Sequence, residues 1–235
     1  MCGRFAQIDA PMEMVEAMGG VVHEPVHLHY NISPGQWAMG YRLGPQGPEL
    51  LSMRWGLLPP WSSDASHARR QSQARMESVA EKPSFRQAFR RRRCVLPVDG
   101  YFEWQGPAQR RQPWYMQGRE GLMMLAGLWE RWEDPQGDAV ETFAVITTEA
   151  TGEAAQIHHR MPLTIPPQGL KAWLDPSFAA PEKLLQSYAR ATPQQQLHPV
   201  TRRVNHPDFD DPICLQPLSA ESLRREQGAE QMSLF

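Results

Sequence analysis

The chain has 235 residues and a formal net charge of −2, with 41% hydrophobic and 21% charged residues. This balance excludes a disordered chain and allows one large domain or two small ones to bury a core. No apolar run reaches the roughly 18 residues of a membrane span, and the start lacks a secretory pattern. We therefore expect a cytoplasmic protein. Its three cysteines, an odd number without CxxC spacing, indicate reduced thiols rather than a disulfide framework or a zinc knuckle.

Gly and Pro, with 17 and 22 residues, indicate many turns and short strands rather than a helical bundle. Hydrophobic runs bounded by these residues predict the elements, and Ser84 is a plausible N-cap. In chain order we expect a helix over 10–18, strands over 21–29 and 50–55, a helix over 84–92, strands over 94–98, 101–104, 114–117, 122–128 and 142–147, and helices over 169–174 and 181–188.

This mixture predicts an α+β fold in a single domain over residues 1–218, with a mainly antiparallel strand core flanked by short helices. Asp99 and Gly100 form a turn signal between two of the strands. Residues 219–235 are polar and end in an apolar tip, which predicts a flexible tail. We expect a monomer, because no interface-like stripe is evident.

Positive charge is concentrated in residues 67–93, which hold nine Lys or Arg and two acidic residues, a local charge of +7. A basic segment on an otherwise acidic chain is typical of a local anion site. A solvated helix face is the alternative. Four consecutive arginines, Arg90 to Arg93, favour phosphate, since guanidinium groups match phosphate oxygens.

Cys2 follows the initiator methionine. Its small side chain permits removal of Met1, which would leave an amine and a thiol on adjacent carbons. Their ordinary pKa values are about 8 and about 8.5, so both are partly nucleophilic near neutrality. An aldehyde would form a Schiff base with the amine, and the thiol would then close a thiazolidine ring. Alternatively, the thiol could attack an acyl group, as in N-terminal-nucleophile hydrolases. A small residue at this position by chance is the third interpretation.

Seven sequence blocks, taken together and in order, resemble the SRAP family (SOS-response-associated peptidase), whose members shield abasic sites. They are residues 1–5 (MCGRF), 30–34 (YNISP), 54–61 (RWGLLPPW), 74–85 (ARMESV and KPSF), 93–104 (RCVLPVDGYFEW), 157–162 (IHHRMP) and 204–205 (VN). The resemblance implies a curved antiparallel core and binding of single-stranded DNA with an abasic site. It also implies crosslinking and lyase-type chemistry at Cys2, and removal of Met1 by a thiol autopeptidase activity.

The same resemblance assigns catalytic roles. Cys2 supplies the amine and the thiol. Glu103 matches the active-site glutamate, which moves protons as a general acid and base. His158 matches the active-site histidine, which would protonate the ring oxygen of the sugar or steady the Schiff base. A surface carboxylate and a core hydrogen-bonding histidine are the alternatives, and His159 is expected to be a bystander.

The resemblance also assigns DNA contacts. Arg75 and Arg160 match arginines near the DNA backbone, where each would hold phosphates. Arg4 and Asn31 match positions near the site. Trp61 would stack on a base or wedge the strand, with core packing as its alternative. For Trp55 we expect core packing.

Gln73 departs from the pattern, because the family has Asn before the Ala-Arg pair. Gln keeps the amide but is longer by one methylene, and a displacement of about 1 Å costs about 100-fold in rate at an active site. Gln73 is therefore a candidate catalytic helper whose geometry decides how active the protein is.

A metal site could be formed by His23, His27 and His29, since imidazoles bind transition metals. No carboxylate or thiolate obviously completes the set, so we expect no metal and no cofactor. Cys94 lies in an apolar run and is expected to be a core thiol.

The last five residues, with Gln231, Leu234 and Phe235, resemble the bacterial peptide that binds the DNA polymerase sliding clamp. A tethered peptide with apolar anchors suits a hydrophobic groove, although five residues can also match by chance. Clamp binding would bring a nucleoid-associated protein to replication forks. Three functions thus remain open: capture of abasic DNA, an N-terminal-nucleophile peptidase, and a non-catalytic DNA-binding or clamp-tethered adaptor.

Overall fold

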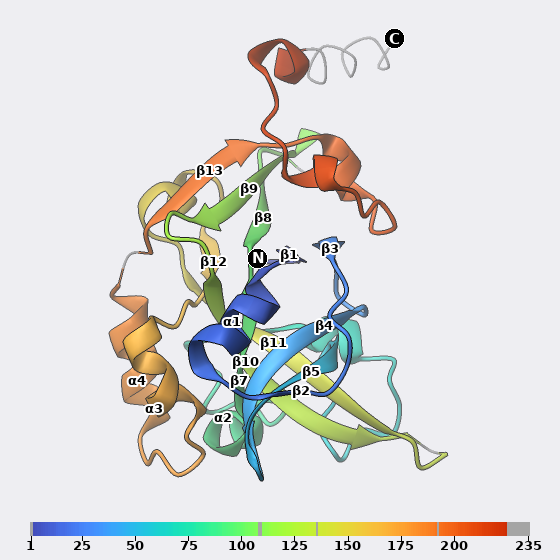
Figure 1. The fold of residues 1–235 in the computed structure, drawn as a ribbon, viewed down its shortest axis with the longest axis vertical. Coiled ribbons are helices and arrows are strands. Elements are labelled where there is room, and N and C mark those ends of the chain that lie inside the picture. The colour runs from blue at the N-terminus through green and yellow to red at the C-terminus, as the bar shows by residue number, and fades with distance from the viewer. Residues whose placement is uncertain (1, 108–109, 135, 192, 225–235) are drawn as a thin grey trace.

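A computed structural model describes residues 2–107, 110–134, 136–191 and 193–224. Within these residues the strands form an eight-stranded and a five-stranded sheet, with short helices around the larger one (Figure 1). The predicted α+β class is confirmed. No helix in the described part of the chain is long and apolar enough to cross a bilayer.

The larger sheet contains a closed barrel of antiparallel neighbours joined by one parallel pair. Phe143 pairs with Trp55 in that parallel contact, which brings the last barrel strand back to an earlier one. Around the barrel run β5 (Gly47–Trp55), β4 (Trp37–Gly44), β7 (Arg93–Val98), β10 (Met123–Glu133) and β11 (Ala139–Glu149). Three short strands extend it: β2 (Val21–Val22) beside β5, and β6 (Gln73–Arg75) and β12 (Arg160–Pro162) beside β11.

The smaller sheet is antiparallel throughout and contains the N-terminal strand. Its order is β13 (Gln195–Pro199), β9 (Gln112–Gly118), β8 (Gly100–Gln105), β1 (Arg4–Gln7) and β3 (His29–Ile32). The chain leaves the barrel at Val98 and enters this sheet at Gly100, so the expected turn at Asp99 is a crossing between sheets. The Asp99 carboxylate accepts the main-chain N–H of Ile8 at 2.6 Å.

Two apolar layers follow from the alternation of side chains along the barrel strands. The inner layer holds Phe5 of β1 on Trp55, with ring centroids 4.6 Å apart, and Trp55 stacked on Phe143 at 5.8 Å. The outer layer is covered by the helices α1 (Ala10–Met18), α2 (Arg86–Arg91), α3 (Leu170–Leu174) and α4 (Pro181–Ala189). The N-terminal strand is thus held at the mouth of the barrel by aromatic packing.

Several sequence predictions are confirmed by these elements, including the helix over 10–18 and the six strands from residue 50 to residue 147. The single strand over 21–29 is wrong: only its ends are extended in sheets, because Pro25 between them cannot donate to a ladder. Ser84 as N-cap is also wrong. The helix begins at Arg86 after Phe85, without a side-chain cap.

Replacing Phe5 with Ala is expected to lower the free energy of unfolding by about 3–5 kcal/mol, because a cavity would open under Trp55. Urea denaturation measures the change. Trp61→Ala is the control, since its ring is exposed and its removal should alter stability by less than about 0.5 kcal/mol. Equal stability of the two variants would contradict the role given to Phe5.

Candidate active site

Four predicted catalytic residues come from four different elements and meet at the mouth of the barrel. Cys2 is fully buried in the inner apolar layer, two residues before the start of β1 at Arg4. Glu103 lies on β8, the direct neighbour of β1, where Arg4 pairs with Phe102. Gln73 begins β6, and His158 precedes β12. Residues more than 150 positions apart in the sequence are thereby brought together.

Gln73 contacts Cys2 directly. Its side-chain amide donates a hydrogen bond to the main-chain carbonyl oxygen of Cys2. The preceding residue is also fixed, because the Ser72 carbonyl accepts the indole N–H of Trp55 at 2.8 Å. The longer Gln side chain therefore reaches the N-terminal segment in this structure.

Glu103 is a buried carboxyl group, with only 2% of its surface exposed. Burial raises its pKa to about 7. Burial also raises the pKa of the Cys2 thiol, and the nearby Glu103 charge raises it further. The thiol is therefore protonated at neutral pH, while Glu103 can both take up and release a proton there.

His158 completes this group. Its Nδ1 atom lies 4.0 Å from a carboxylate oxygen of Glu103 and accepts the main-chain N–H of Arg160 at 3.0 Å. Burial lowers its pKa, so the ring is mainly neutral at pH 7. Nδ1 also lies 3.2 Å from the Arg160 carbonyl oxygen, so both main-chain groups of Arg160 hold the ring in place. A titratable carboxyl and an imidazole thus lie together beside Cys2.

The two predicted phosphate-binding arginines differ in their surroundings. Arg160 forms a bidentate ion pair with Glu77 at 2.6 and 3.0 Å and donates to the Thr147 carbonyl at 2.6 Å. Arg75, on the parallel neighbour of β11, is exposed. Arg75 is therefore open to a ligand, whereas Arg160 braces the strand that follows His158. A phosphate contact of either remains a prediction.

Arg4 and Asn31 connect the N-terminal strands to the end of the domain. Asn31 is 1% exposed, accepts from Arg4 at 2.9 Å, and donates to the Phe209 carbonyl at 2.8 Å. Arg4 also donates to the Val204 carbonyl at 2.6 Å. The structure thus gives Asn31 a structural role, and the DNA contacts predicted for the two residues remain predictions.

The two tryptophans of the RWGLLPPW block differ in burial. Trp55 is fully buried, as expected for core packing, while Trp61 is 64% exposed. Stacking of Trp61 on a base remains a prediction that this exposure permits. Cys94 is buried in the inner layer, which confirms its assignment as a core thiol.

Arg111 belongs to the electrostatics of the site and was not predicted. It is exposed just before β9, and its positive charge acts to lower the pKa values of both Glu103 and His158. The neighbouring strand is tied to the His158 segment, because Gln105 donates to the Gln156 carbonyl at 2.9 Å. The sequence feature that could have indicated this role is the basic pair Arg110 and Arg111, which lies between the strand of Glu103 and the next strand.

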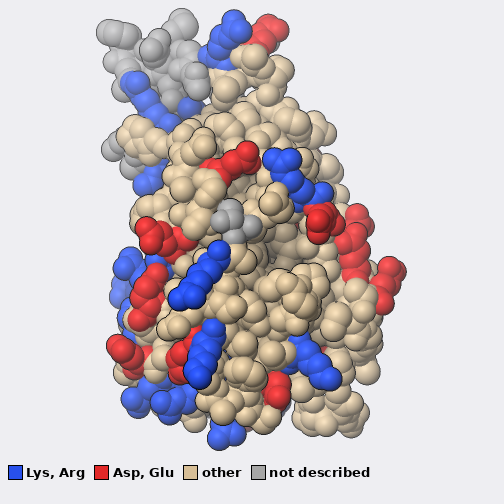
Figure 2. Space-filling view, turned by 90° about the vertical axis from the view of Figure 1, so that its left-hand side faces the viewer, with Lys and Arg blue, Asp and Glu red and all other residues tan. Residues whose placement is uncertain are grey.

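The arginine run does not form the expected phosphate clamp. Arg93 is buried and donates to main-chain carbonyls, among them Trp173 and Phe89 at 2.7 and 2.8 Å. Arg92 pairs with Glu130 at 2.7 Å. On the face over β13, α3 and α4, positive and negative side chains are interspersed rather than gathered by sign (Figure 2). Two of the four arginines, Arg92 and Arg93, therefore stabilise the fold through contacts within the protein.

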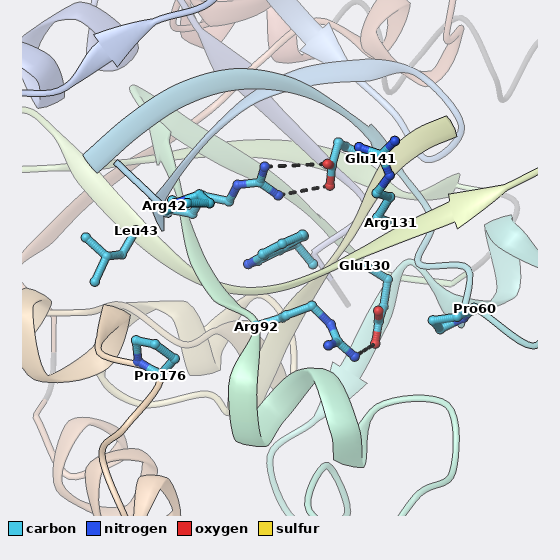
Figure 3. A pocket seen from close by; sticks show the side chains of 11 residues that line it. Arg42, Leu43, Pro60, Arg92, Glu130, Arg131, Glu141 and Pro176 are labelled. Atoms are coloured by element: carbon cyan, nitrogen blue, oxygen red, sulfur yellow. Dashed lines mark hydrogen bonds and ion pairs between the residues drawn. The ribbon is translucent and has the colours of Figure 1, made fainter. Parts of the chain in front are cut away.

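A cavity of about 550 Å³ lies at the opposite end of the barrel (Figure 3). Arg42 on its wall is held by Glu141 at 2.9 Å and Glu49 at 2.7 Å and lies over the Trp129 ring at 3.7 Å. These ion pairs close the barrel below its aromatic core. The cavity is thus separate from Cys2.

The histidines of the possible metal site have other partners. His23 contacts Glu49 and His29 contacts Asp210, at 2.9 and 2.8 Å. Within the residues that the structure describes, no group of His, Cys, Asp and Glu side chains is arranged to hold a metal ion.

Comparison with known proteins identifies the class to which this fold and site belong. The family model described as SOS response associated peptidase (SRAP) matches residues 1–207. The chain therefore belongs to the SRAP family. It is 31% identical to the abasic site processing protein YoqW of Bacillus subtilis, over 92% of this chain and 99% of YoqW. It is 29% identical to the abasic site processing protein HMCES of Gallus gallus, over 78% of this chain and 68% of that protein.

Solved structures agree with the fold. A protein from Bacteroides thetaiotaomicron matches 93% of this chain and all of its own with a TM-score of 0.81 at 24% identity. A phage-related protein from Bordetella bronchiseptica matches 86% of this chain and 95% of its own, with a TM-score of 0.69 at 27% identity. The predicted family and fold are confirmed.

Replacing Glu103 with Gln should flatten the dependence of stability on pH. The folded-state pKa of about 7 lies above that of an unfolded glutamate, so the folded protein binds the proton more tightly. The contribution of Glu103 to the free energy of unfolding is complete below about pH 4.5 and is lost as pH rises through 7. The free energy of unfolding changes by about 3 kcal/mol over this range. Urea denaturation from pH 4 to 8 measures this slope.

Glu77→Gln provides the matched comparison, because Arg160 lowers the pKa of the Glu77 carboxyl. That group contributes its full stability above about pH 4.5 and loses it only as pH falls through its lowered pKa, so Glu77→Gln should leave the slope between pH 5 and 8 unchanged. Parallel curves for Glu103→Gln and the parent protein would show that Glu103 has no raised pKa.

Proposed function

We propose that this protein captures abasic sites in single-stranded DNA through Cys2, forming a covalent crosslink. The observation that carries the proposal is the convergence of Glu103, His158 and Gln73 on a buried N-terminal cysteine. Relatives of similar length are named abasic site processing proteins, which supports the same class of DNA lesion.

The chemistry needs a free Cys2 amine, so Met1, which lies outside the described residues, must first be removed. The Cys2 thiol would attack the Met1 carbonyl and form a thioester, with the released amine taking a proton. Water would then hydrolyse the thioester, releasing methionine and regenerating the thiol. In this scheme Glu103 would take the thiol proton, since its charge acts on Cys2 and its own pKa is about 7.

Crosslinking would follow in two steps. The amine adds to the aldehyde carbon of the ring-opened sugar, and loss of one water gives the Schiff base. The thiol sulfur then adds to the same carbon, and its proton goes to the nitrogen, which closes the thiazolidine ring. The overall change is aldehyde plus cysteine to thiazolidine plus water, with no oxidant or cofactor.

The side chains have separate tasks in this scheme. Glu103 would exchange protons with the sugar oxygen and the Schiff base, since its pKa is about 7. His158, whose lowered pKa keeps its ring neutral, would act on the same atoms through its ring nitrogens. Gln73 fixes the Cys2 carbonyl, which orients the amine. The exposed Arg75 and Trp61 are available for the flanking phosphate and base.

The direct test is a denaturing gel of the protein with labelled single-stranded DNA bearing one abasic site, without added reductant. A heat-resistant shifted band is expected, and Cys2→Ala should abolish it. Mass spectrometry of each sample establishes that Met1 has been removed. No band from correctly processed parent protein would refute covalent capture and leave a binding or adaptor function.

Gln73→Ala should slow crosslinking about fivefold, because it removes one hydrogen bond worth about 1 kcal/mol from the Cys2 backbone. Gln73→Asn retains the amide and tests its reach, with rates taken from the same gels under single-turnover conditions. Rates unchanged in both variants would show that Gln73 is not a helper.

We also propose that residues 231–235, which lie outside the described residues, bind the bacterial sliding clamp. The Gln231, Leu234 and Phe235 pattern supports this. Deleting these five residues should abolish co-elution with the purified clamp on a sizing column while leaving crosslinking unchanged. Co-elution of the shortened chain would refute the proposal.

A further inference from the structure

A second exposed tryptophan borders a small cavity near the mouth of the barrel. Trp37 begins β4 and is 50% exposed. The cavity beside it has a volume of about 220 Å³ and is also lined by Glu24, His27, His29 and Ser52. It combines one aromatic wall with carboxylate, imidazole and hydroxyl groups, which is the chemistry that recognises a nucleobase by stacking and by its polar edge.

The cavity is on the outer side of the barrel wall whose inner side holds the N-terminal strand. Ala38 packs in the inner layer and Met39 in the outer one, so alternation places Trp37 on the outer side. The turn before Trp37 is bonded to Trp55, because Gly35 donates to the Trp55 carbonyl at 2.7 Å. Trp55 in turn contacts Phe5. This turn, at the rim of the barrel, thus connects the cavity wall to the aromatic packing that holds the N-terminal strand.

Two arginines lie along this rim. Arg54, the cross-strand neighbour of Trp37, donates to the Gly35 carbonyl at 3.2 Å. Arg69 lies against the other side of Gly35, where its Nε atom would be 3.1 Å from an added Cβ. Arg69 belongs to the 3-10 helix Ala68–Gln71, which leads directly to Ser72 and Gln73. Positive charge thus follows the path from the cavity to the site.

We propose that this cavity binds an unpaired base of the same DNA strand, stacked on Trp37, with the intervening phosphates held by Arg54 and Arg69. The inference rests on the proposed function and adds to it a subsite for a nucleotide outside the lesion. Charge complementarity favours a nucleic acid over an uncharged ligand, since both arginines lie at Gly35, in the turn that connects the cavity wall to the aromatic core.

The test uses fluorescein-labelled single-stranded DNA that carries tetrahydrofuran, an abasic analogue without an aldehyde, so that binding is measured apart from crosslinking. Trp37→Ala should weaken binding of a 15-nucleotide strand about tenfold in fluorescence anisotropy. A three-nucleotide strand centred on the analogue should bind the variant and the parent equally. Trp37→Phe keeps a stacking surface and should restore most of the affinity.

Met12→Ala removes another exposed apolar side chain and is the matched control, expected to bind as the parent does. With true abasic DNA, Trp37→Ala should need a strand concentration about tenfold higher than the parent does to reach its half-maximal crosslinking rate. If the parent crosslinks DNA but Trp37→Ala binds the long strand as tightly as Met12→Ala, the subsite is refuted and the proposed function stands. If the parent neither binds nor crosslinks, both are refuted.

Discussion

A chain terminus can act as a reagent only if it is held in one place, and here the burial of Phe5 against Trp55 supplies that constraint. The contact fixes the first strand between a barrel and a second sheet, and it places Cys2 in an apolar layer. The smaller sheet then sets Glu103 beside β1 through strand pairing. Every other part of the site is arranged around this fixed segment.

The same burial determines the chemistry. A carboxyl group removed from water prefers its neutral form, which is why the pKa of Glu103 is near 7 rather than near that of a free glutamate. The arrangement costs stability at neutral pH but yields a group that can both accept and donate a proton there. Burial also favours the neutral form of His158, which lowers the pKa of its imidazole. A neutral imidazole and a titrating carboxyl therefore face each other. The positive charge of Arg111 opposes the rise in the pKa of Glu103 and adds to the lowering of the pKa of His158.

Much of this architecture was accessible from the sequence, because local patterns carry it. The helix over 10–18 has the right length and begins near Pro11, and the barrel strands are apolar runs between turns. The candidate catalytic residues could be predicted only through the resemblance to a family. What could not be predicted depends on contacts between distant segments: the burial of Asn31 under Phe209, and the pairing of Arg160 with Glu77. A guanidinium in a sequence looks the same whether it faces a phosphate or a carboxylate.

The hydrogen bonds that join Arg4 and Asn31 to residues 204–209 have a consequence for the newly made protein. At synthesis rates of about 5–20 residues per second, Cys2 is added to the chain on the order of 10–40 s before Val204. Throughout that interval the first strand lacks the partners that hold it, and the His158 segment is missing for most of it. The environment that buries Cys2 beside Glu103 and His158 is therefore complete only after translation of the domain has finished.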